Sequence, residues 1–364
     1  MMKLDQGRFT QSDFQIHNLN HPSTQHNFKT ALTLQQSLFD PLTRAQVRVS
    51  QAASERGRQE LEAVRHDTAF QVFRLFLAIR RASARLHAAD QAVEQARENL
   101  RLARVRSEAG TGLKSDELRA RTHLAGVEQQ QISARHTVQM AQLRLADLLA
   151  LSEGTRAEIV PDNVSLPLPP PREQLIRLAQ AERSELLMSQ NDIEKAEAAG
   201  SLARAAYLPS LTAFASYQLD SRSTPFGSDN DAWLAGASLR WEIFDGFRRS
   251  GERQRAAAVL SSAREAQVAL SRQTALQVDE SLMLHEEAFK RLEVVRHSRE
   301  DAEETVRLIS RRFENSLATM SELLDAQTAL FQVRAAHSEA EADYALARGA
   351  VYHAAGTLLK EITK

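Results

Sequence analysis

Two short segments, Leu38-Phe39-Asp40 and Ile243-Phe244-Asp245, decide the fold of this chain, because each ends an alternating segment and precedes a very long helical one. Their aspartates are 205 positions apart, and at the same offset Gly110 corresponds to Asn315. Each copy continues with a polar turn and a second helical segment. A duplication of this length exceeds the period of short solenoid repeats. It indicates one large supersecondary unit used twice around a pseudo-symmetric axis.

Composition favours helices and excludes several classes of protein. Among 364 residues there are only 13 Gly and 9 Pro, which favours long helices. The 46 basic and 47 acidic residues leave a net charge of −1, which argues against a nucleic-acid partner. There is no cysteine, and the 11 histidines show no ligand spacing, so we expect no disulfide and no metal site. No catalytic arrangement or cofactor motif is present, so we expect no enzyme and no cofactor.

Three segments, at 28–38, 211–219 and 233–243, alternate apolar and polar residues with the period of a β-strand. A polar loop joins the last two and predicts a hairpin. Trp233 and Trp241 would lie about 26 Å apart along an extended strand. That spacing is comparable with a bilayer core, so the two indoles are candidate membrane-interface aromatics.

The helical segments are too long for one globular core. The stretches 43–109 and 247–314 lack proline, and each would form a helix about 100 Å long. Shorter helical stretches are expected at 115–151, 173–206 and 319–359. Rods of this length must pair with equally long neighbours. A few strands cannot close a barrel, and open sheet edges are not tolerated in lipid. The sequence therefore predicts several copies that share one barrel and one helical cylinder.

The order and spacing of several motifs resemble the TolC-like outer membrane factor family over residues 28–364. The motifs are Tyr207–Leu211, Phe244–Arg249, Glu322–Gln327, Ala355-Gly356 and, in the first copy, Gly110–Asp116. The resemblance implies a mostly α fold with a small β part. Long antiparallel helices would form a trimeric α-barrel tunnel, and strands would be contributed to a shared transmembrane β-barrel.

The resemblance also implies a location, partners and a function. The chain would lie in the outer membrane of a Gram-negative-type cell, in contact with its lipid, and extend into the periplasm. As a homotrimer it would be the passive channel of a tripartite efflux pump or a type I secretion system. It would dock on a periplasmic adaptor (membrane fusion) protein and an inner-membrane pump of the RND or ABC type.

Five segments follow from this interpretation. They are a partial first β-hairpin and extracellular loop (1–27), a first repeat (28–151), an equatorial linker and helix (152–206), a second β-hairpin (207–245) and the second-repeat helices (246–364). Relative to the family, we expect the signal peptide and the first helix to be missing. A non-functional truncated copy of the channel, or a soluble coiled-coil scaffold or adaptor, is therefore an alternative.

Four residues match positions at the periplasmic entrance of the family. Glu322 and Asp325, three apart on one helix, would form a ring of six carboxylates in a trimer and gate cations. Alternatively, they are ordinary acids near a helix N-terminus. Asp116 and Phe313 match positions whose side chains hold the entrance closed, although Asp116 can equally be a helix cap.

The two helix–helix turns are candidate adaptor contacts, again by resemblance. The residues concerned are Gly110, Thr111, Gly112, Leu113, Ser316, Leu317, Ala318 and Thr319. Alternatively, the glycines merely permit the turn. The family's basic partner near Ala318 is absent, so a latch would use Arg311, Arg312 or Lys114.

Overall fold

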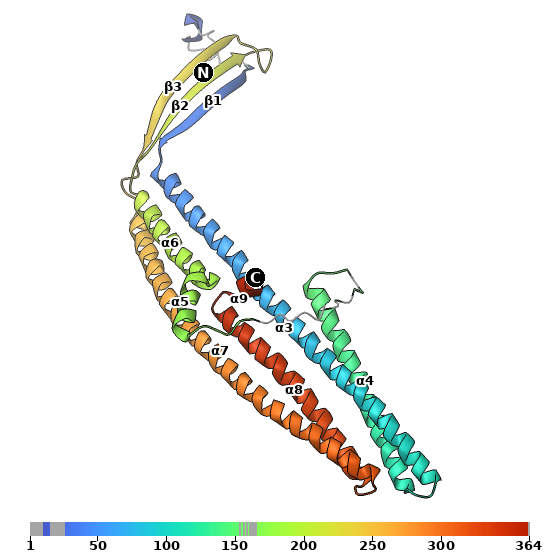
Figure 1. The fold of residues 1–364 in the computed structure, drawn as a ribbon. Helices are drawn as coiled ribbons and strands as arrows, with labels where there is room; N and C mark the ends of the chain where they lie inside the picture. Colours follow the sequence, from blue (N-terminus) through green and yellow to red (C-terminus); the bar gives the residue numbers. More distant parts are fainter. Residues whose placement is uncertain are drawn as a thin grey trace. The chain divides into compact units, whose positions relative to one another are not determined.

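The computed structural model describes residues 10–14, 26–152, 154, 155, 157, 159 and 166–362 (Figure 1). The chain divides into two units, which we describe separately. Unit 1 comprises Met1–Arg56 and Gln190–Ala266, and unit 2 comprises Gly57–Ser189 and Gln267–Lys364. The predicted class, mostly helical with a small sheet, is confirmed. Most of the hairpin predicted at 1–27 lies outside the described residues; within it, Gln11–Phe14 forms the 3-10 helix η1.

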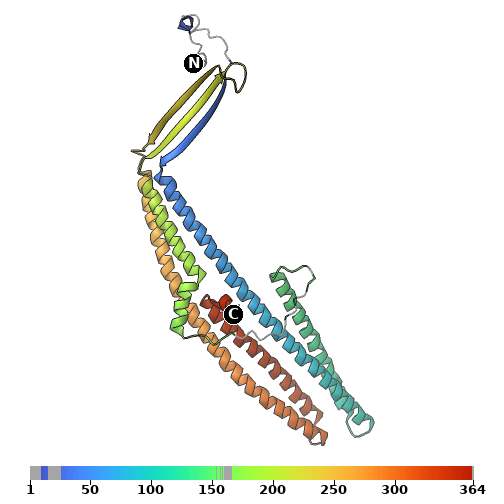
Figure 2. The same ribbon diagram turned by 45° about the horizontal axis from the view of Figure 1, so that its top comes forward.

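Unit 1 contains an antiparallel three-stranded sheet in the order β1-β2-β3 (Figure 2). Its strands are β1 (Phe28–Phe39), β2 (Ser210–Ser221) and β3 (Asn230–Arg240), as the alternation predicts. Leu32 is paired with Tyr217, and Tyr217 with Trp233, so one row of side chains crosses all three strands. The centre strand β2 therefore joins segments that lie far apart in the sequence.

The sheet has two chemically different faces, because directly paired residues point to the same side. What we call the apolar face comprises Thr30, Leu32, Leu34 and Gln36 on β1, Leu211, Ala213, Ala215, Tyr217 and Leu219 on β2, and Trp233, Ala235, Ala237 and Leu239 on β3. What we call the polar face comprises Lys29, Ala31, Thr33, Gln35 and Ser37 on β1, Ser210, Thr212, Phe214, Ser216 and Gln218 on β2, and Ala232, Leu234, Gly236, Ser238 and Arg240 on β3.

Three helices belong to both units. The long helices α3 (Pro41–Glu108) and α7 (Arg248–Glu314) begin in unit 1 and end in unit 2, and the shorter α6 (Ser184–Ala205) begins in unit 2 and ends in unit 1. The turn before α7 is longer than the turn before α3, and within it Gly246 and Phe247 both have positive φ, 66° and 67°. The repeat offset is therefore 205 only up to the aspartates. At the helix ends it is 206 (314 minus 108). Gly110 thus corresponds structurally to Ser316, not to Asn315 as the sequence offset suggests.

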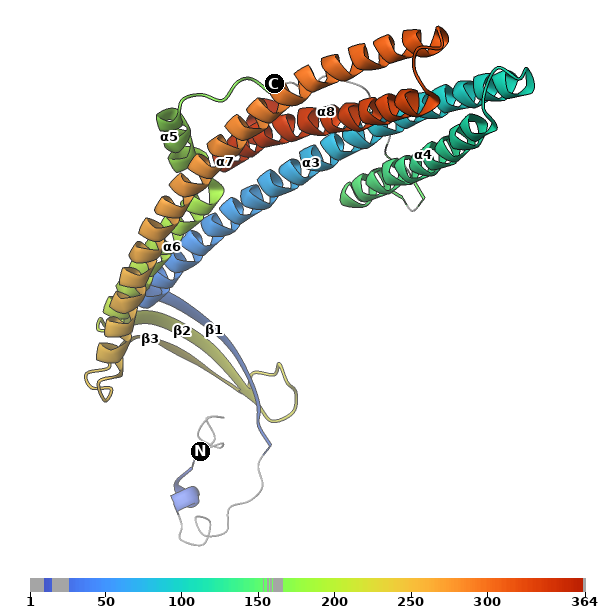
Figure 3. The same ribbon diagram turned by 90° about the horizontal axis from the view of Figure 1, so that it is seen from below.

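Unit 2 is built from two antiparallel helix hairpins. One is the second half of α3 with α4 (Lys114–Leu148), and the other is the second half of α7 with α8 (Met320–Ala354) (Figure 3). Two short helices, α5 (Arg172–Glu182) and α9 (Leu358–Ile362), complete the unit. None of the described helices combines the length and the apolar composition that crossing a bilayer requires.

Two predicted helices are interrupted. The stretch 173–206 breaks at Arg183, whose backbone is extended, and the stretch 319–359 breaks at Gly356, which has a φ of +72°. The two breaks pack together, since a Cβ on Gly356 would lie 3.1 Å from Arg183 Cα. The break at Gly356 also has a local cause, because glycine readily takes the positive φ that ends a helix.

The interior consists of several small clusters. One holds α5 against α7 and α8 through Leu175, Val278 and Val351, all fully buried. In another, α8 approaches α3 so closely that a methyl group at Gly349 would overlap the Phe73 ring. On α8 the buried residues recur at helical spacing, among them Leu323, Ala326, His337, Ala340, Val351 and Ala354.

Candidate functional site

The first helix–helix turn is closed by backbone geometry. The amides of Thr111 and Gly112 both donate to the Arg106 carbonyl at 2.9 Å, and Gly110 has a φ of +72°. A Cβ at Gly112 would lie 2.9 Å from Arg106 Cβ, so this turn needs its second glycine as well. Leu113 precedes α4 as its N-cap and supplies no side-chain cap.

The second turn is closed by the same kind of backbone bond and, in addition, by side chains. Ser316 has the positive φ, 61°, and the Leu317 amide donates to the Arg312 carbonyl at 2.7 Å. Thr319 and Glu322 form a capping box: the Thr319 amide donates to Glu322 Oε2 (2.6 Å), and the Glu322 amide donates to Thr319 Oγ1 (3.2 Å). Both orphan amides are thereby satisfied.

Phe313 is buried in the cluster that joins the two hairpins near their tips. Its neighbours there are Ala103, Ala120, Met320, Leu323 and Leu324. The Arg106 guanidinium lies 4.5 Å from the centroid of the Phe313 ring. The predicted entrance aromatic is therefore a core residue of the tips, and it carries a cation–π contact between α3 and α7.

A direct polar contact crosses from one hairpin to the other at Arg119 on α4, whose guanidinium donates to the Ser321 hydroxyl on α8. Two of the basic residues considered for a latch, Arg312 and Lys114, are engaged within their own hairpins. Arg312 donates to the Leu317 carbonyl, and Lys114 donates to Glu117 at 2.5 Å. Arg119 was missed because its neighbours at i+4 and i−4 gave no sign of a partner two hundred residues away.

The three predicted entrance acids differ in their surroundings: Asp116 is on α4, and Glu322 and Asp325 are on α8. Asp116 is half-buried and lines a cavity of about 360 Å³ between the tips. Glu322 is exposed, and hydrogen bonds from the Thr319 amide and hydroxyl hold the pKa of its carboxyl below the usual range. Asp325 is exposed, and its charge partly offsets the burial that lowers the pKa of His123.

Glu117 is a buried carboxylate that sequence reasoning missed. It is only 3% exposed, and it corresponds at offset 206 to Leu323, which is 4% exposed. The hydrogen bond from Lys114 lowers the pKa of Glu117, and Arg121 donates to it at 3.0 Å. The spacing of these charges, i−3 and i+4, matches an ordinary solvated helix face, so the sequence gave no sign of burial.

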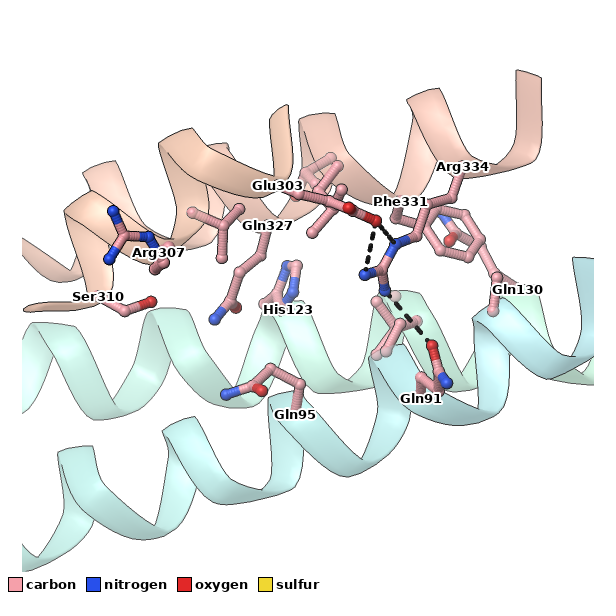
Figure 4. Close-up of a pocket in the computed structure, with 17 residues that line it drawn as sticks. Gln91, Gln95, His123, Gln130, Glu303, Arg307, Ser310, Gln327, Phe331 and Arg334 are labelled. Carbon is pink, nitrogen blue, oxygen red and sulfur yellow. Dashed lines mark hydrogen bonds and ion pairs between the residues drawn. The ribbon is translucent and has the colours of Figure 1, made fainter. Parts of the chain in front are cut away.

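A second cavity, of about 660 Å³, lies between the two hairpins (Figure 4). It is farther from the helix–helix turns than the cluster around Phe313. Glutamines project into it from three helices, among them Gln91, Gln130 and Gln327. Arg334 crosses it and donates to Glu303 on α7 (3.1 Å) and to Gln91 on α3 (3.3 Å). The two hairpins therefore meet through polar side chains here, and through apolar ones at the tips.

In unit 1 the two tryptophans differ in setting. Trp233 lies on the apolar face, 75% exposed, with its ring centroid 4.7 Å from that of Tyr217. Trp241 lies just beyond β3, 59% exposed, and its indole donates to the Tyr207 carbonyl at 3.1 Å. Both present large aromatic surface to the surroundings, which suits residues at a lipid boundary.

The junction between β3 and α7 is organised by Arg249, which is buried. Its guanidinium donates to Asp245 Oδ2 (2.8 Å), to the carbonyls of Glu242 (2.6 Å) and Ile243 (3.1 Å), and to that of Ala206 (3.3 Å). One side chain thus fixes the chain's exit from the sheet and its entry into the helix. The Asp–Arg spacing of four was the signal available in the sequence.

Known proteins share the sequence pattern of this chain. A family model described as outer membrane efflux protein matches residues 7–151 and 175–357. Protein CyaE of Bordetella pertussis is 29% identical over 210 residues, a match that covers 55% of this chain and 44% of the relative. The matched segment therefore spans less than half the length of that curated relative.

Solved structures share the fold at low identity. The outer membrane protein VceC of Vibrio cholerae has a TM-score of 0.76 at 20% identity, covering 90% of this chain and 79% of that one. The MtrE outer membrane channel of Neisseria gonorrhoeae, in its open state, also has a TM-score of 0.76, at 18% identity, covering 94% and 82%. Because the family model matches most of the sequence, this chain belongs to the outer membrane efflux protein family, as its resemblance to TolC-like factors predicts.

Proposed function

We propose that this chain assembles with two further copies into a duct through the outer membrane, and that solutes pass along it without chemical change. The sheet of unit 1 would form part of the shared barrel. The apolar face would contact lipid, and the polar face would line the lumen. Family membership and the shared fold support this proposal.

The observation that carries the proposal is the unfinished sheet. Among the residues that the structure describes, β1 and β3 each pair along one edge only. Exposed strand edges with an apolar face cannot remain open in lipid, since each unpaired backbone group costs several kcal/mol there (about 2–7 kcal/mol in an apolar medium). Copies that pair edge to edge would satisfy both strands, whereas a soluble scaffold would gain nothing from an exposed Trp233.

At the other end of the duct, the tips would form the entrance and the docking surface for a periplasmic adaptor. Glu322 and Asp325 would supply the acidic ring. The capping box occupies one oxygen of Glu322, so Asp325 is the carboxylate with more freedom to meet a permeating cation. An inner-membrane pump of the RND or ABC type would complete the assembly, in drug or metal efflux or in type I secretion.

The channel is tested in planar bilayers with the purified full chain. The absence of cysteine allows single-cysteine variants without background labelling. Ser238→Cys on the polar face and its neighbour Ala237→Cys on the apolar face form a matched pair. A charged, membrane-impermeant thiol reagent should reduce the conductance of the first variant and leave the second unchanged. A water-soluble monomer that forms no channels would support the scaffold alternative and overturn the proposal.

The entrance is tested by cation block of single-channel current. Asp325→Asn should weaken block by a divalent cation more than Glu322→Gln does, because Glu322 is committed to the cap. Glu293→Gln, an exposed acid on α7, serves as the control and should leave the block unchanged. Equal block in all four proteins would remove both residues from the acidic ring.

A further inference from the structure

One aromatic side chain lies on the otherwise aliphatic and polar surface that the proposed duct turns toward its lumen. Phe214, on the centre strand, is the only aromatic residue among the described strand residues of the polar face. Side chains in a sheet stand roughly perpendicular to it, so an unsupported phenyl ring would project into the lumen. In three copies, three rings would then narrow the same level of the duct.

The structure shows why the ring does not project. Phe214 is paired directly with Gly236 on β3, and its ring leans across that strand. A Cβ built on Gly236 would lie 2.9 Å from Phe214 Cζ and 3.4 Å from Cε1. The ring therefore occupies the space that any other residue at 236 would fill with its own side chain.

We propose that Phe214 and Gly236 together set the bore of the duct in its sheet region. Gly236 determines which solutes can pass, because the absence of a side chain at this position leaves space on β3 for the Phe214 ring. We call this space the glycine seat. With the ring seated, the duct admits bulky solutes. With a side chain at 236, the Phe214 ring is displaced from β3 toward the lumen, since the far end of a side chain yields more readily than the backbone of a paired strand. This inference rests on the proposed function.

A purely structural role for the pair gives different expectations. Aromatic side chains stabilise strand glycines by covering them. If covering were the whole role, changes at either residue would alter stability and leave the conductance of the intact channel unchanged. If the pair sets the bore, the two residues are coupled in conductance, and the coupling is non-additive.

The test measures single-channel conductance for four proteins: the wild type, Gly236→Ala, Phe214→Ala and the double variant. Gly236→Ala should reduce conductance by about half, far more than one methyl group would do alone, because pore radius controls passage. Phe214→Ala should change it little, because the ring is already against the wall. The double variant should return to the wild-type value. Ala235→Val, which adds bulk next door on the apolar face, is the control and should have no effect.

A second variant keeps the sheet intact. Phe214→Trp leaves the glycine seat in place and exceeds it in size, so conductance should fall without any change at 236. A large rise in conductance for Phe214→Ala alone would show that the ring projects in the wild type and would overturn the inference. So would wild-type conductance in Gly236→Ala channels. If the wild-type chain forms no channels, the proposed function is overturned. If it forms channels whose conductance does not depend on the residue at 236, only this inference is overturned.

Discussion

The two repeats share a backbone plan but are stabilised by different chemistry. In the first, Asp40 accepts a hydrogen bond from the Thr43 amide (3.0 Å) and simply caps α3. In the second, Asp245 shares a buried guanidinium that also holds three carbonyl groups. The turns differ in the same sense, glycine geometry in one and a capping box in the other. The two copies turn at corresponding places in the chain, and they hold those turns by different interactions.

The largest difference is expected at the strand–helix junctions. Arg249→Met leaves three backbone carbonyls without their donor, which should destabilise the protein by about 3 kcal/mol at roughly 1 kcal/mol each. Asp40→Ala removes only a cap and should cost about 1 kcal/mol. Thermal unfolding in detergent measures both, with the exposed neighbour Arg248→Met as control. Equal losses at the two junctions would contradict the contrast drawn between them.

The next difference concerns helix approach. Gly349→Ala would force a methyl group into the Phe73 ring and should cost about 1–3 kcal/mol by overpacking. The corresponding position of the first repeat, at offset 206, is Leu143, which is 43% exposed. Leu143→Ala should change stability by less than about 0.5 kcal/mol. The same thermal unfolding assay compares the two, and a tolerated Gly349→Ala would show that the hairpins do not need this close contact.

A smaller difference is expected at the helix caps. Thr319→Ala should destabilise the second hairpin by about 1 kcal/mol, because the Glu322 amide loses its acceptor. Leu113→Thr would give the first hairpin the cap that it lacks, and should stabilise it by about 0.5 kcal/mol. Amide hydrogen exchange in the first turns of α8 and α4 reports each change locally. Exchange should become faster in α8 for Thr319→Ala and slower in α4 for Leu113→Thr. A change in the same direction at both helices would contradict this expectation.

The smallest effect is the dependence on pH that Glu117 contributes at the first tip. The pKa of Glu117 is lower in the folded protein than its usual value of 4.5, so its contribution to stability is present above about pH 4.5 and is lost as the pH falls through the folded value. Glu117→Leu, which introduces the residue found at this position in the second repeat, should reduce the fall in unfolding temperature at acid pH. Glu314→Gln, an exposed tip acid, serves as the control and should leave it unchanged.

Much of the fold could be predicted from local sequence. The strands alternate with period two, the helices are long and free of proline, and the turns fall where the pattern stops. The break at Arg183 has no local signal, whereas Gly356 is a recognised helix stop that lies inside the expected stretch 319–359. The one-residue shift after Gly246 was also hidden, because the flanking motifs still align at 205.

The tips were predicted, but their chemistry was only partly accessible. Resemblance placed Glu322 and Asp325 near the second turn, and the Thr-x-x-Glu spacing contained the capping box. Burial of Glu117 and the Arg119–Ser321 contact depend on how two hairpins pack, which one sequence does not encode locally. The role proposed for Phe214 could not be predicted either, because it depends on which residue of β3 is paired with it.

The pairing of β1 with β2 has a consequence for synthesis. Thr33 and Ser216, which share a hydrogen bond across the two strands, are 183 residues apart, and β3 follows later still. An emerging chain must therefore carry β1 without its partner β2 until 183 further residues, from Thr33 to Ser216, have been made. Contacts this distant in sequence form slowly, and open strands are prone to wrong pairing. Until β2 has been made, β1 is therefore the strand of this sheet with the longest opportunity to pair wrongly.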